Sequence, residues 1–386
     1  MAAKRRISVV TGSRAEYGLL RWVIDELHRD PEIDLQLVVT GMHLSPDYGL
    51  TWKEIERDGY PISERVEMLE GSDSPKGIAR SIGRAVAGFG EVFERLQPDI
   101  VVLLGDRFEV FAAAQAALVS NVPIAHIAGG DTTEGAYDEA FRHGITKMAH
   151  LHLVTNELAA RRVVQMGEDP AMVRIVGSPG LDNLRRLALL DRETLRTELG
   201  GVFRARNLLV TFHPVTLEPG GSTQHFTALL EALDSLGIHT GLFFTKPNAD
   251  TGGRALGAML EAWAASRPNA HVYTSLGQLR YLSLMAQVDV VVGNSSSGLY
   301  EAPSLHKPTV DIGDRQRGRL AADSVIHCDP NRASIAAALA AAFQRDCSRT
   351  LNPYGDGHSS TRIVAALKVM PGPQSVLKKR FHLVGE

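Results

Sequence analysis

The sequence predicts an α/β protein with two doubly wound domains, and three observations lead to this prediction. The chain has 386 residues, more than one hydrophobic core usually organises, and this length suits two domains. Short β-branched apolar runs alternate with segments of helical period, as in parallel strands joined by right-handed crossovers. The alternation stops in a Gly/Pro turn and a charged helix at residues 177–195, and then starts again.

The first half contains six apolar runs that we expect to form one buried parallel sheet. They are RISVVTG (6–12), LQLVVTG (35–41), DIVVLLGD (99–106), PIAHIAGG (123–130), HLHLVTN (150–156) and VRIVGSP (173–179). Helices are expected between them at residues 16–29, 75–96, 108–120, 138–149 and 158–166. Strands that alternate with helices in this way predict a doubly wound sheet.

The second half repeats this pattern with six further runs. They are NLLVTFHP (207–214), GLFFTKPN (241–248), HVYTS (271–275), VDVVVGNSSSG (288–298), KPTVDIG (307–313) and SVIHC (324–328). We therefore expect an N-terminal domain over residues 1–180 and a second domain over residues 181–357. A final helix is expected at residues 360–369.

The composition indicates a globular protein without a bulk nucleic-acid or membrane partner. Hydrophobic residues make up 44% of the chain, and 41 basic against 44 acidic residues give a net charge of −3. The N-terminal apolar run ISVV is too short for a signal peptide, and no run approaches the length of a membrane span. The two cysteines, Cys328 and Cys347, do not suggest a disulfide framework. We expect a cytoplasmic protein.

Seven loops follow the predicted strands and are expected to carry the ligand site. In open parallel sheets, ligands bind at the carboxyl ends of the strands, where backbone amides and helix N-termini are free. The loops are TGSRAEYG (11–18), LGDRFE (104–109), HIAGGDTTEG (126–135), FHPVT (212–216), TKPNAD (245–250), GNSSSG (293–298) and IGDRQRGR (312–319). Two facing domains would bring these loops together in one cleft.

Two of the loops have the build of a phosphate site. Arg14 lies near the first turn of a helix, where it can reach an anion bound by the helix amides. Asn294, Ser295 and Ser296 can cap a helix while their amides and hydroxyls face a diphosphate. Glu301, one turn further, can accept both hydroxyls of a ribose. An ordinary strand–turn–helix explains each loop equally well, and neither matches GxGxxG or GxxxxGK[ST].

Arginine and histidine add further candidates to these loops. Arg315, Arg317 and Arg319 follow the strand KPTVDIG, and three arginines in five residues favour a phosphate or interface role over a solvated loop. His213 follows the strand LLVTF and precedes a proline. We therefore expect His213 to be exposed in the cleft and to contact the substrate.

The stretch HIAGGDTTEGAYDEAFRH (126–143) holds four carboxylates and two histidines directly after a predicted buried strand. Most charged residues lie on surfaces, so loop capping by Asp131 and Glu134 and a solvated helix face after Asp138 would explain it. The alternative is a catalytic cluster, because carboxylates in a shared, partly dry site shift one another's pKa values apart. The sequence has no HExxH or CxxC motif, and no metal is expected.

Taken together and in order, the loops resemble the UDP-N-acetylglucosamine 2-epimerase family, most closely its hydrolysing branch in sialic and legionaminic acid biosynthesis. The resemblance runs from about Ile7 to about Ile363 and rests on TGSRAEYG, LGDRFE, HIxGG with DExxRHxITKMAHLH, FHPVT, KPNAD and GNSSSGLYEAPSLHKPTVDIGDRQRGR. It implies a glycosyltransferase-B-like fold, in which two Rossmann-like domains face a cleft and the C-terminal segment, residues 358–386, returns to the first domain.

The resemblance also implies a reaction that needs no cofactor. A base removes the proton at C2 of the sugar while UDP leaves C1 by anti elimination, and water adds to the resulting 2-acetamidoglucal. The products are UDP and the free manno-configured sugar. The expected substrate is UDP-N-acetylglucosamine or UDP-2,4-diacetamido-2,4,6-trideoxyglucose, and the expected assembly is a homodimer or homotetramer.

The resemblance assigns roles to individual positions. Asp106 and Asp138 match catalytic carboxylates, and His213 matches a histidine that assists the leaving phosphate. Arg142 and His143 lie on the predicted helix of Asp138, and we expect them to orient that carboxylate or to meet the diphosphate. Five residues match nucleotide-contacting positions: Arg14, Ser295, Ser296, Glu301 and Arg315. Asn248 and Asp250 lie near them in the motifs, and Glu134 and Gly298 are further expected substrate or nucleotide contacts.

One residue departs from the family pattern. Several members carry a catalytic glutamate as the third residue of HIEGG or HVEAG, where this chain has Ala128. The loop before Asp138 is longer here and contributes Asp131 and Glu134. Our hypothesis is that Asp131 supplies the missing catalytic group.

Three other functions suit the same fold. A non-hydrolysing epimerase would return a nucleotide-linked product, and a glycosyltransferase would need an acceptor groove where this chain has several carboxylates. A nucleotide-sugar sensor without catalysis is kept open by Ala128. Incubation with the nucleotide sugar alone separates these alternatives, because only the hydrolysing epimerase releases UDP and a free epimerised sugar without an acceptor.

Overall fold

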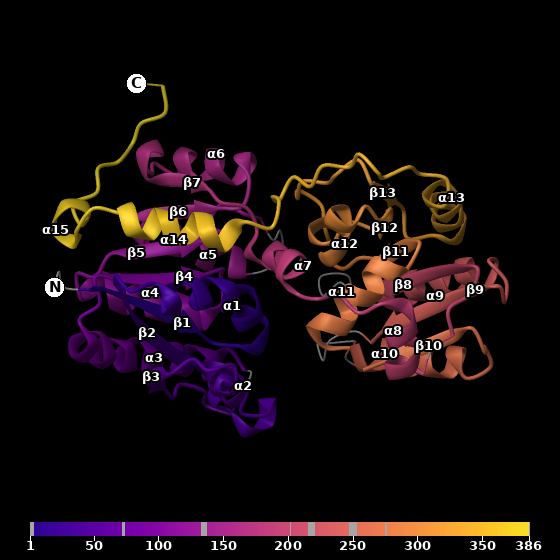
Figure 1. Cartoon of the computed structure of the whole chain (residues 1–386), viewed down its shortest axis with the longest axis horizontal. Helices are drawn as coiled ribbons and strands as arrows, with labels where there is room; N and C mark the ends of the chain where they lie inside the picture. The colour runs from indigo at the N-terminus through magenta and orange to yellow at the C-terminus, as the bar shows by residue number, and fades with distance from the viewer. Residues whose placement is uncertain are drawn as a thin grey trace. The chain divides into compact units, whose positions relative to one another are not determined.

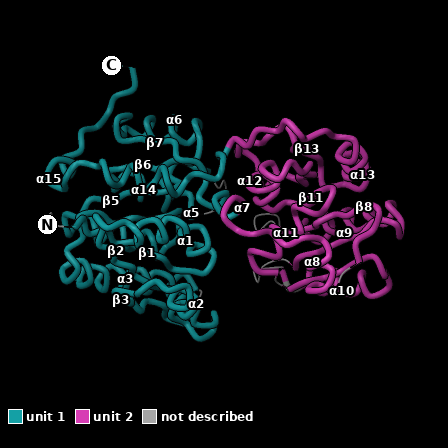
Figure 2. Tube along the Cα trace, viewed as in Figure 1, with its two compact units in different colours: residues 1–183, 354–386 teal, residues 184–353 magenta. Residues whose placement is uncertain are grey.

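The computed structural model describes residues 4–71, 74–132, 137–200, 202–214, 221–246, 253–274 and 276–385. The chain divides into two units, each with its own sheet (Figure 2). Unit 1 consists of residues 1–183 and 354–386, and unit 2 of residues 184–353. Among the helices in the described ranges, none combines the length and apolar character that a membrane span requires.

Unit 1 is built on a seven-stranded sheet with the order β3-β2-β1-β4-β5-β6-β7, in which all neighbouring strands pair in parallel. The order reverses between β1 and β4. The carboxyl ends of these two strands are therefore the switch point at which ligands bind in doubly wound sheets. The strands are β1 (Arg5–Thr11), β2 (Ile33–Thr40), β3 (Ile62–Val66), β4 (Ile100–Leu104), β5 (Ile124–Ile127), β6 (Leu151–Val154) and β7 (Val173–Ile175).

Helices cover both faces of this sheet (Figure 1). Because side chains alternate along a strand, Leu37 and Val39 of β2 join one apolar cluster, with helices α1 and α14, and Val38 joins another, with α3 and α4. The helices are α1 (Arg14–Arg29), α2 (Trp52–Arg57), α3 (Pro75–Leu96), α4 (Phe108–Val119), α5 (Asp138–Met148), α6 (Glu157–Gln165), α7 (Asp182–Arg186), α14 (Ser359–Val369) and α15 (Pro373–Val376).

Helix α14 comes from the C-terminal end of the chain and packs against α1 in unit 1. Asp182 caps its first turn, since the carboxylate accepts from the backbone N–H of Ser359 at 2.8 Å and of Ser360 at 2.7 Å. A carboxylate at a helix N-terminus satisfies free amides and complements the helix dipole. The predicted return of the C-terminal segment to the first domain is therefore confirmed.

Unit 2 repeats the architecture on six parallel strands with the order β10-β9-β8-β11-β12-β13. Its order reverses between β8 and β11. The strands are β8 (Arg206–Thr211), β9 (Thr240–Thr245), β10 (Ala270–Tyr273), β11 (Val290–Gly293), β12 (Thr309–Ile312) and β13 (Val325–Cys328). The helices are α8 (Arg192–Leu199), α9 (Gly221–Asp234), α10 (Gly253–Ala264), α11 (Gly277–Gln287), α12 (Ser297–Tyr300) and α13 (Arg332–Ala342).

Two parallel α/β sheets confirm the predicted fold class, and every run that was predicted to be a strand contains one. The prediction missed β3. This edge strand, ISERV, includes Glu64 and Arg65 and has one buried residue, Val66, so it lacks the apolar run that marked the other strands. Charged side chains on an edge strand discourage pairing with another chain.

Candidate active site

The strand ends of unit 1 bring together acidic residues from the loops after β4 and β5. Asp106 follows β4 directly after Gly105, whose φ of +80° favours glycine and lets the chain turn. Asp138 is the first residue of α5. Arg142, one turn further along α5, donates from Nη2 to Oδ2 of Asp106. One ion pair therefore joins the loop after β4 to the helix that carries Asp138.

Arg142 is buried and makes further contacts from its other guanidinium nitrogen. Its Nη1 donates to Oε2 of Glu139 at 2.9 Å and to the backbone carbonyl of Asp131 at 2.7 Å. The guanidinium thus contacts the loops after β4 and β5 as well as its own helix. Charge-assisted hydrogen bonds in such an enclosed network hold the carboxylate of Asp106 in a fixed orientation.

Asp138 has the chemistry of a proton carrier. Burial raises the pKa of its carboxyl, and the negative charge of Asp106 raises it further, against the opposing effect of Arg107 and Arg142. The negative charge of Asp106 therefore favours the protonated form of Asp138. The two carboxyls can therefore supply an acid and a base to one reaction.

A second guanidinium, that of Arg107, lies beside these carboxylates. Glu109 fixes it with two hydrogen bonds, from Nε to Oε2 at 3.2 Å and from Nη2 to Oε1 at 2.8 Å, and Glu109 has no exposed surface. Both residues belong to the LGDRFE loop, but neither was predicted as a site residue. The pattern that could have indicated them is a pair of opposite charges two residues apart at the start of a predicted helix.

His126 connects the loop after β4 to α5 from inside the sheet. Its Nε2 lies 2.8 Å from the carbonyl oxygen of Gly105, and its Nδ1 lies 3.3 Å from Oγ1 of Thr146. Burial lowers the pKa of this imidazole to about 3, so the ring is neutral. His126 therefore positions neighbouring segments and carries no charge.

The loop after β5 contains the residue that we expected to replace the family glutamate. Oδ1 of Asp131 accepts from Oγ1 of Thr155 at 2.8 Å, at the end of β6, while the Asp131 carbonyl binds Arg142. Nε2 of His143 lies 3.1 Å from Oε1 of Glu139 on the same helix. Glu134 lies outside the described residues.

Arg14 is the first residue of α1, at the other side of the β1–β4 switch point. Its side chain is 61% exposed, and Nε lies 3.1 Å from Oε2 of Glu54. An exposed ion pair of this kind contributes little to stability. A ligand anion can therefore take the place of Glu54.

In unit 2, the carboxamide of Asn294 holds the backbone of His213. Oδ1 of Asn294 accepts from the His213 N–H at 2.7 Å, and Nδ2 donates to the His213 carbonyl at 2.8 Å. The expectation that His213 is exposed was wrong: the residue is buried, with 9% relative exposure. The paired hydrogen bonds explain this, because they hold the end of β8 against the end of β11. Asn294 is used for this clamp and does not cap a helix.

The GNSSSG loop leads into the short helix α12 and presents several hydroxyl groups. Oγ of Ser295 lies 3.0 Å from Oγ of Ser297, and Ser296 is the N-cap residue without a side-chain hydrogen bond to the helix. Burial raises the pKa of the Glu301 carboxyl to about 7. Gly298 has a packing role, since a Cβ there would lie 2.6 Å from Cγ2 of Thr309.

The arginine-rich loop after β12 attaches to the same asparagine. Nη1 of Arg315 donates to the Asn294 carbonyl at 3.0 Å, and Nε2 of Gln316 donates to the same oxygen at 2.8 Å. The structure therefore brings Arg315 next to the GNSSSG loop. Asn248 and Asp250, expected nearby, lie outside the described residues.

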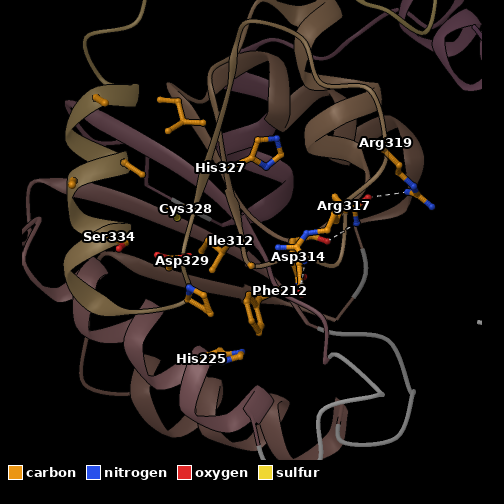
Figure 3. Close-up of a pocket in the computed structure, with 18 of the residues that line it drawn as sticks. Phe212, His225, Ile312, Asp314, Arg317, Arg319, His327, Cys328, Asp329 and Ser334 are labelled. Atoms are coloured by element: carbon orange, nitrogen blue, oxygen red, sulfur yellow. Dashed lines mark hydrogen bonds and ion pairs between the residues drawn. The ribbon is translucent and has the colours of Figure 1, made fainter. Parts of the chain in front are cut away.

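A pocket of about 950 Å³ opens beside this loop within unit 2 (Figure 3). Its lining includes Asn294 and Arg319, but neither Ser295 nor Glu301. His327 also lines it, held by an ion pair from Nδ1 to Oδ2 of the buried Asp311 at 2.7 Å. The pocket therefore adjoins the predicted nucleotide loop and only partly coincides with it.

Known proteins match the chain along most of its length. The model of the family described as UDP-N-acetylglucosamine 2-epimerase matches residues 25–368. A "GDP/UDP-N,N'-diacetylbacillosamine 2-epimerase (hydrolyzing)" of Campylobacter jejuni is 37% identical over 85% of this chain and 85% of its own. A "UDP-N,N'-diacetylbacillosamine 2-epimerase (hydrolyzing)" of Legionella pneumophila is 36% identical over 97% of this chain and 98% of its own.

Solved structures share the fold at lower sequence identity. A putative UDP-N-acetylglucosamine 2-epimerase from Listeria monocytogenes has a TM-score of 0.81 at 20% identity and covers 99% of this chain and 100% of its own. UDP-GlcNAc 2-epimerase from Neisseria meningitidis, solved bound to UDP-GlcNAc, has a TM-score of 0.81 at 19% identity, with 94% of this chain and 99% of its own covered. At this identity the likeness concerns the fold alone.

Proposed function

Because the chain belongs to the UDP-N-acetylglucosamine 2-epimerase family, we propose that it is a hydrolysing 2-epimerase of a UDP-linked 2-acetamido sugar. Family membership confirms the resemblance that the loops indicated. The similarity to the two hydrolysing enzymes supports release of UDP and a free manno-configured sugar. The single structural observation that carries the mechanism is the site in which the charge of Asp106 acts on the Asp138 carboxyl, with Arg142 bound to Asp106.

The first step is the removal of the C2 proton by Asp106 together with the departure of UDP. Asp106, held by Arg142, takes the proton from C2, and the electrons of that C–H bond form the C1=C2 double bond of the glycal. The C1–O bond breaks, and its electrons leave with UDP. The positive charges of Arg107 and Arg142 favour ionised carboxyls in this site. They therefore suit a base that must be ionised before it takes the proton.

In the second step water adds to the glycal. The water oxygen joins C1, Asp138 gives its proton to C2 from the face opposite Asp106, and the remaining water proton returns to Asp138. Asp106 then releases the proton that it took from C2 to solvent. The raised pKa of Asp138 supports this assignment, because it favours the protonated form, which can act as the acid. Protonation on the opposite face inverts C2.

We assign the nucleotide to the loops of unit 2. His213 assists the leaving phosphate, and Ser295, Ser296 and Arg315 contact the diphosphate. Support comes from the attachment of both the His213 and the Arg315 segments to Asn294, which fixes their loops relative to each other. Glu301 binds the ribose hydroxyls, and Arg14 of unit 1 is a further phosphate ligand.

Asp131 is our candidate for the third carboxylate. Ala128 stands where several family members carry glutamate, and its φ of +62° is rare for a residue other than glycine. The position of Asp131 supports this assignment, because its backbone carbonyl accepts a hydrogen bond from Arg142, which also binds Asp106. Its carboxylate is oriented by Thr155.

The finer assignments follow the named relatives. We propose UDP-N-acetylglucosamine or UDP-2,4-diacetamido-2,4,6-trideoxyglucose as the substrate, in nonulosonic (sialic or legionaminic) acid biosynthesis. The proposed enzyme is cytoplasmic and a homodimer or homotetramer. Light scattering of the purified protein reports the assembly directly.

Proton NMR of the reaction in heavy water tests the function, with the two candidate sugars supplied separately and no acceptor. We expect UDP and a free manno sugar with deuterium at C2. A nucleotide-linked epimer would indicate the non-hydrolysing reaction, and no turnover without an acceptor would indicate a transferase. UDP binding without any turnover would indicate a sensor.

A further inference from the structure

Glu16 occupies the β1–β4 switch point of unit 1 without being a predicted site residue. It lies in the first turn of α1 and is 4% exposed. Its N–H donates to Oγ of Ser13 at 3.3 Å, and its Oε2 accepts from the N–H of Gly12 at 2.9 Å. This is close to a capping box, in which a serine and a glutamate three residues later satisfy the first amides of a helix.

Glu16 faces a second buried carboxyl, that of Glu109. The Glu109 side chain fills the space above two glycines: a Cβ on Gly12 would lie 3.2 Å from its Cβ, and a Cβ on Gly41 would lie 2.9 Å from its Cγ. Gly41 also has a φ of +55°. The chain therefore keeps both positions free of side chains and packs Glu109 there.

The charges in this group do not balance if both carboxyls are ionised. The guanidinium of Arg107 acts on both carboxyls, but its two hydrogen bonds from Nε and Nη2 go to Glu109. Within the described ranges, Oε1 of Glu16 is buried and accepts no hydrogen bond. A buried carboxylate without a cation or full hydrogen bonding is costly, so a group in this position keeps its proton.

The surrounding groups act in the same direction. Burial is the main effect that raises the pKa of Glu16 to about 8, and the charges of Glu109 and Asp106 add to it, while the Gly12 amide and Arg107 oppose it. His43, which follows the neighbouring strand β2, bonds to Thr11 through Nε2, and burial lowers its pKa to about 4. That imidazole is neutral and supplies no positive charge.

We propose that Glu16 is a positioning residue that works as a neutral carboxyl. It holds the Gly12–Ser13 turn and leaves the guanidinium of Arg107 to Glu109 and to the catalytic carboxylates. An ionised Glu16 would draw Arg107 away from Asp106 and Asp138. The effect on catalysis rests on the proposed function, in which those two carboxylates move the protons.

The variant Glu16→Gln separates the neutral form from the charged one, because an amide copies the protonated carboxyl in shape and keeps an acceptor for Gly12. In the wild type, kcat/KM should fall about tenfold per pH unit above pH 8, as one ionising group requires. In Glu16→Gln, kcat/KM at pH 7 should stay within about threefold of the wild type, and the fall above pH 8 should disappear. Glu16→Ala should lose activity at every pH.

The matched control is Glu193→Gln, in the first turn of α8, where the side chain is 74% exposed. It should leave the pH profile unchanged. An alkaline fall in Glu16→Gln as steep as in the wild type would overturn the proposal. Equal losses in Glu16→Gln and Glu16→Ala would also overturn it, because they would mean that the negative charge is needed.

A second readout does not depend on turnover. The difference infrared spectrum of ¹³C-glutamate-labelled wild type and Glu16→Gln should contain a protonated carboxyl band at pH 7 that vanishes near pH 8 to 9. A carboxylate band at pH 6 would overturn the neutral carboxyl. If the band is as expected but no UDP sugar is converted, the proposed function fails and the protonation state of Glu16 stands.

Discussion

The switch point of unit 1 and the switch point of unit 2 share one topology and differ in chemistry. At β1 and β4 the side chains are carboxyls and guanidinia: Asp106, Arg107 and Glu109, with Glu16 behind them. At β8 and β11 they are a carboxamide and hydroxyls, from Asn294 and the serines that follow it. The same backbone frame therefore holds titratable groups in one unit and neutral hydrogen-bonding groups in the other.

The difference teaches how the two tasks divide. Proton transfer needs groups whose pKa values are displaced by burial and by neighbouring charge, and Asp138 and Glu16 in unit 1 have such values. Holding a diphosphate, the task that we propose for unit 2, needs directed donors on a rigid frame, and the clamp of Asn294 on His213 makes that frame rigid. Mutations in unit 1 should therefore change turnover, and mutations in unit 2 should change nucleotide affinity.

The largest expected effect is the loss of a catalytic carboxyl. Asp106→Asn and Asp138→Asn should each lower kcat by about 10³-fold or more, equivalent to about 4 kcal/mol, because an amide can neither accept nor give the proton. UDP affinity, measured by calorimetry, should stay within about threefold, because neither carboxyl is among the nucleotide ligands that we propose.

Asp34→Asn serves as the control for these two variants, since Asp34 is exposed on β2 and distant in sequence from the site. It should leave both kcat and UDP affinity unchanged. If Asp106→Asn abolished UDP binding together with turnover, the division of tasks between the units would be wrong.

The next effect tests whether Asp131 belongs to the chemistry of unit 1. Asp131→Asn should lower kcat by about 10²-fold if its carboxylate takes part in proton transfer. Thr155→Val is the matched variant, because it removes the hydrogen bond to Oδ1 and leaves the carboxylate in place. Near-normal turnover in Asp131→Asn would contradict the hypothesis, and equal losses in both variants would reduce Asp131 to a structural role.

The sequence alone predicted the sheets well, because their strands are apolar runs that end in turn residues. Asp106 and Asp138 were selected from their motifs, and the structure joins their segments through Arg142. The motif that contains Glu16 was quoted, but its burial depends on Glu109, 93 positions later, lying against Gly12. No local pattern reports such a long-range contact.

The prediction that His213 is exposed was wrong for the same physical reason. A histidine between a strand and a proline suggested an open loop, but the carboxamide of Asn294, 81 residues later, fixes its backbone at the end of β8. A polar residue after a strand can cap a helix, bind a ligand or clamp another strand, and only the fold decides among these. The burial of His213 therefore depends on a contact between two strands that are distant in sequence, and local composition does not report it.

The third effect tests the clamp of unit 2. Asn294→Ala should weaken UDP binding about tenfold and destabilise the protein by about 1–3 kcal/mol, because two buried backbone groups of His213 lose their partners. The kcat should fall less than the affinity. Calorimetry with UDP and thermal unfolding give the two quantities.

Asn331→Ala is the control for the clamp, since Asn331 caps α13 through Ser334 on the exposed surface. Loss of that cap should cost about 1 kcal/mol of stability and leave UDP affinity unchanged. Equal effects of the two variants on UDP binding would mean that the affinity responds to stability and not to the clamp.

The smallest effect concerns pH and unit 2. Burial raises the pKa of Glu301 to about 7, so the carboxyl is mostly protonated at pH 6 and mostly ionised at pH 8. In the proposed site the ionised form accepts both ribose hydroxyls, so UDP affinity should rise about fivefold between these pH values. Stability should change in the opposite sense: it falls from pH 4.5 to above pH 7, because the unfolded chain releases this proton more easily.

Glu301→Gln should remove both trends. The phosphates of UDP also titrate near pH 6, but their contribution appears in both proteins and cancels in the difference. Parallel affinity curves for the wild type and Glu301→Gln would mean that this carboxyl does not bind the ribose. Unit 2 would then bind the nucleotide through neutral groups and arginines alone. In that case, carboxyls with shifted pKa values would have a functional role only in unit 1.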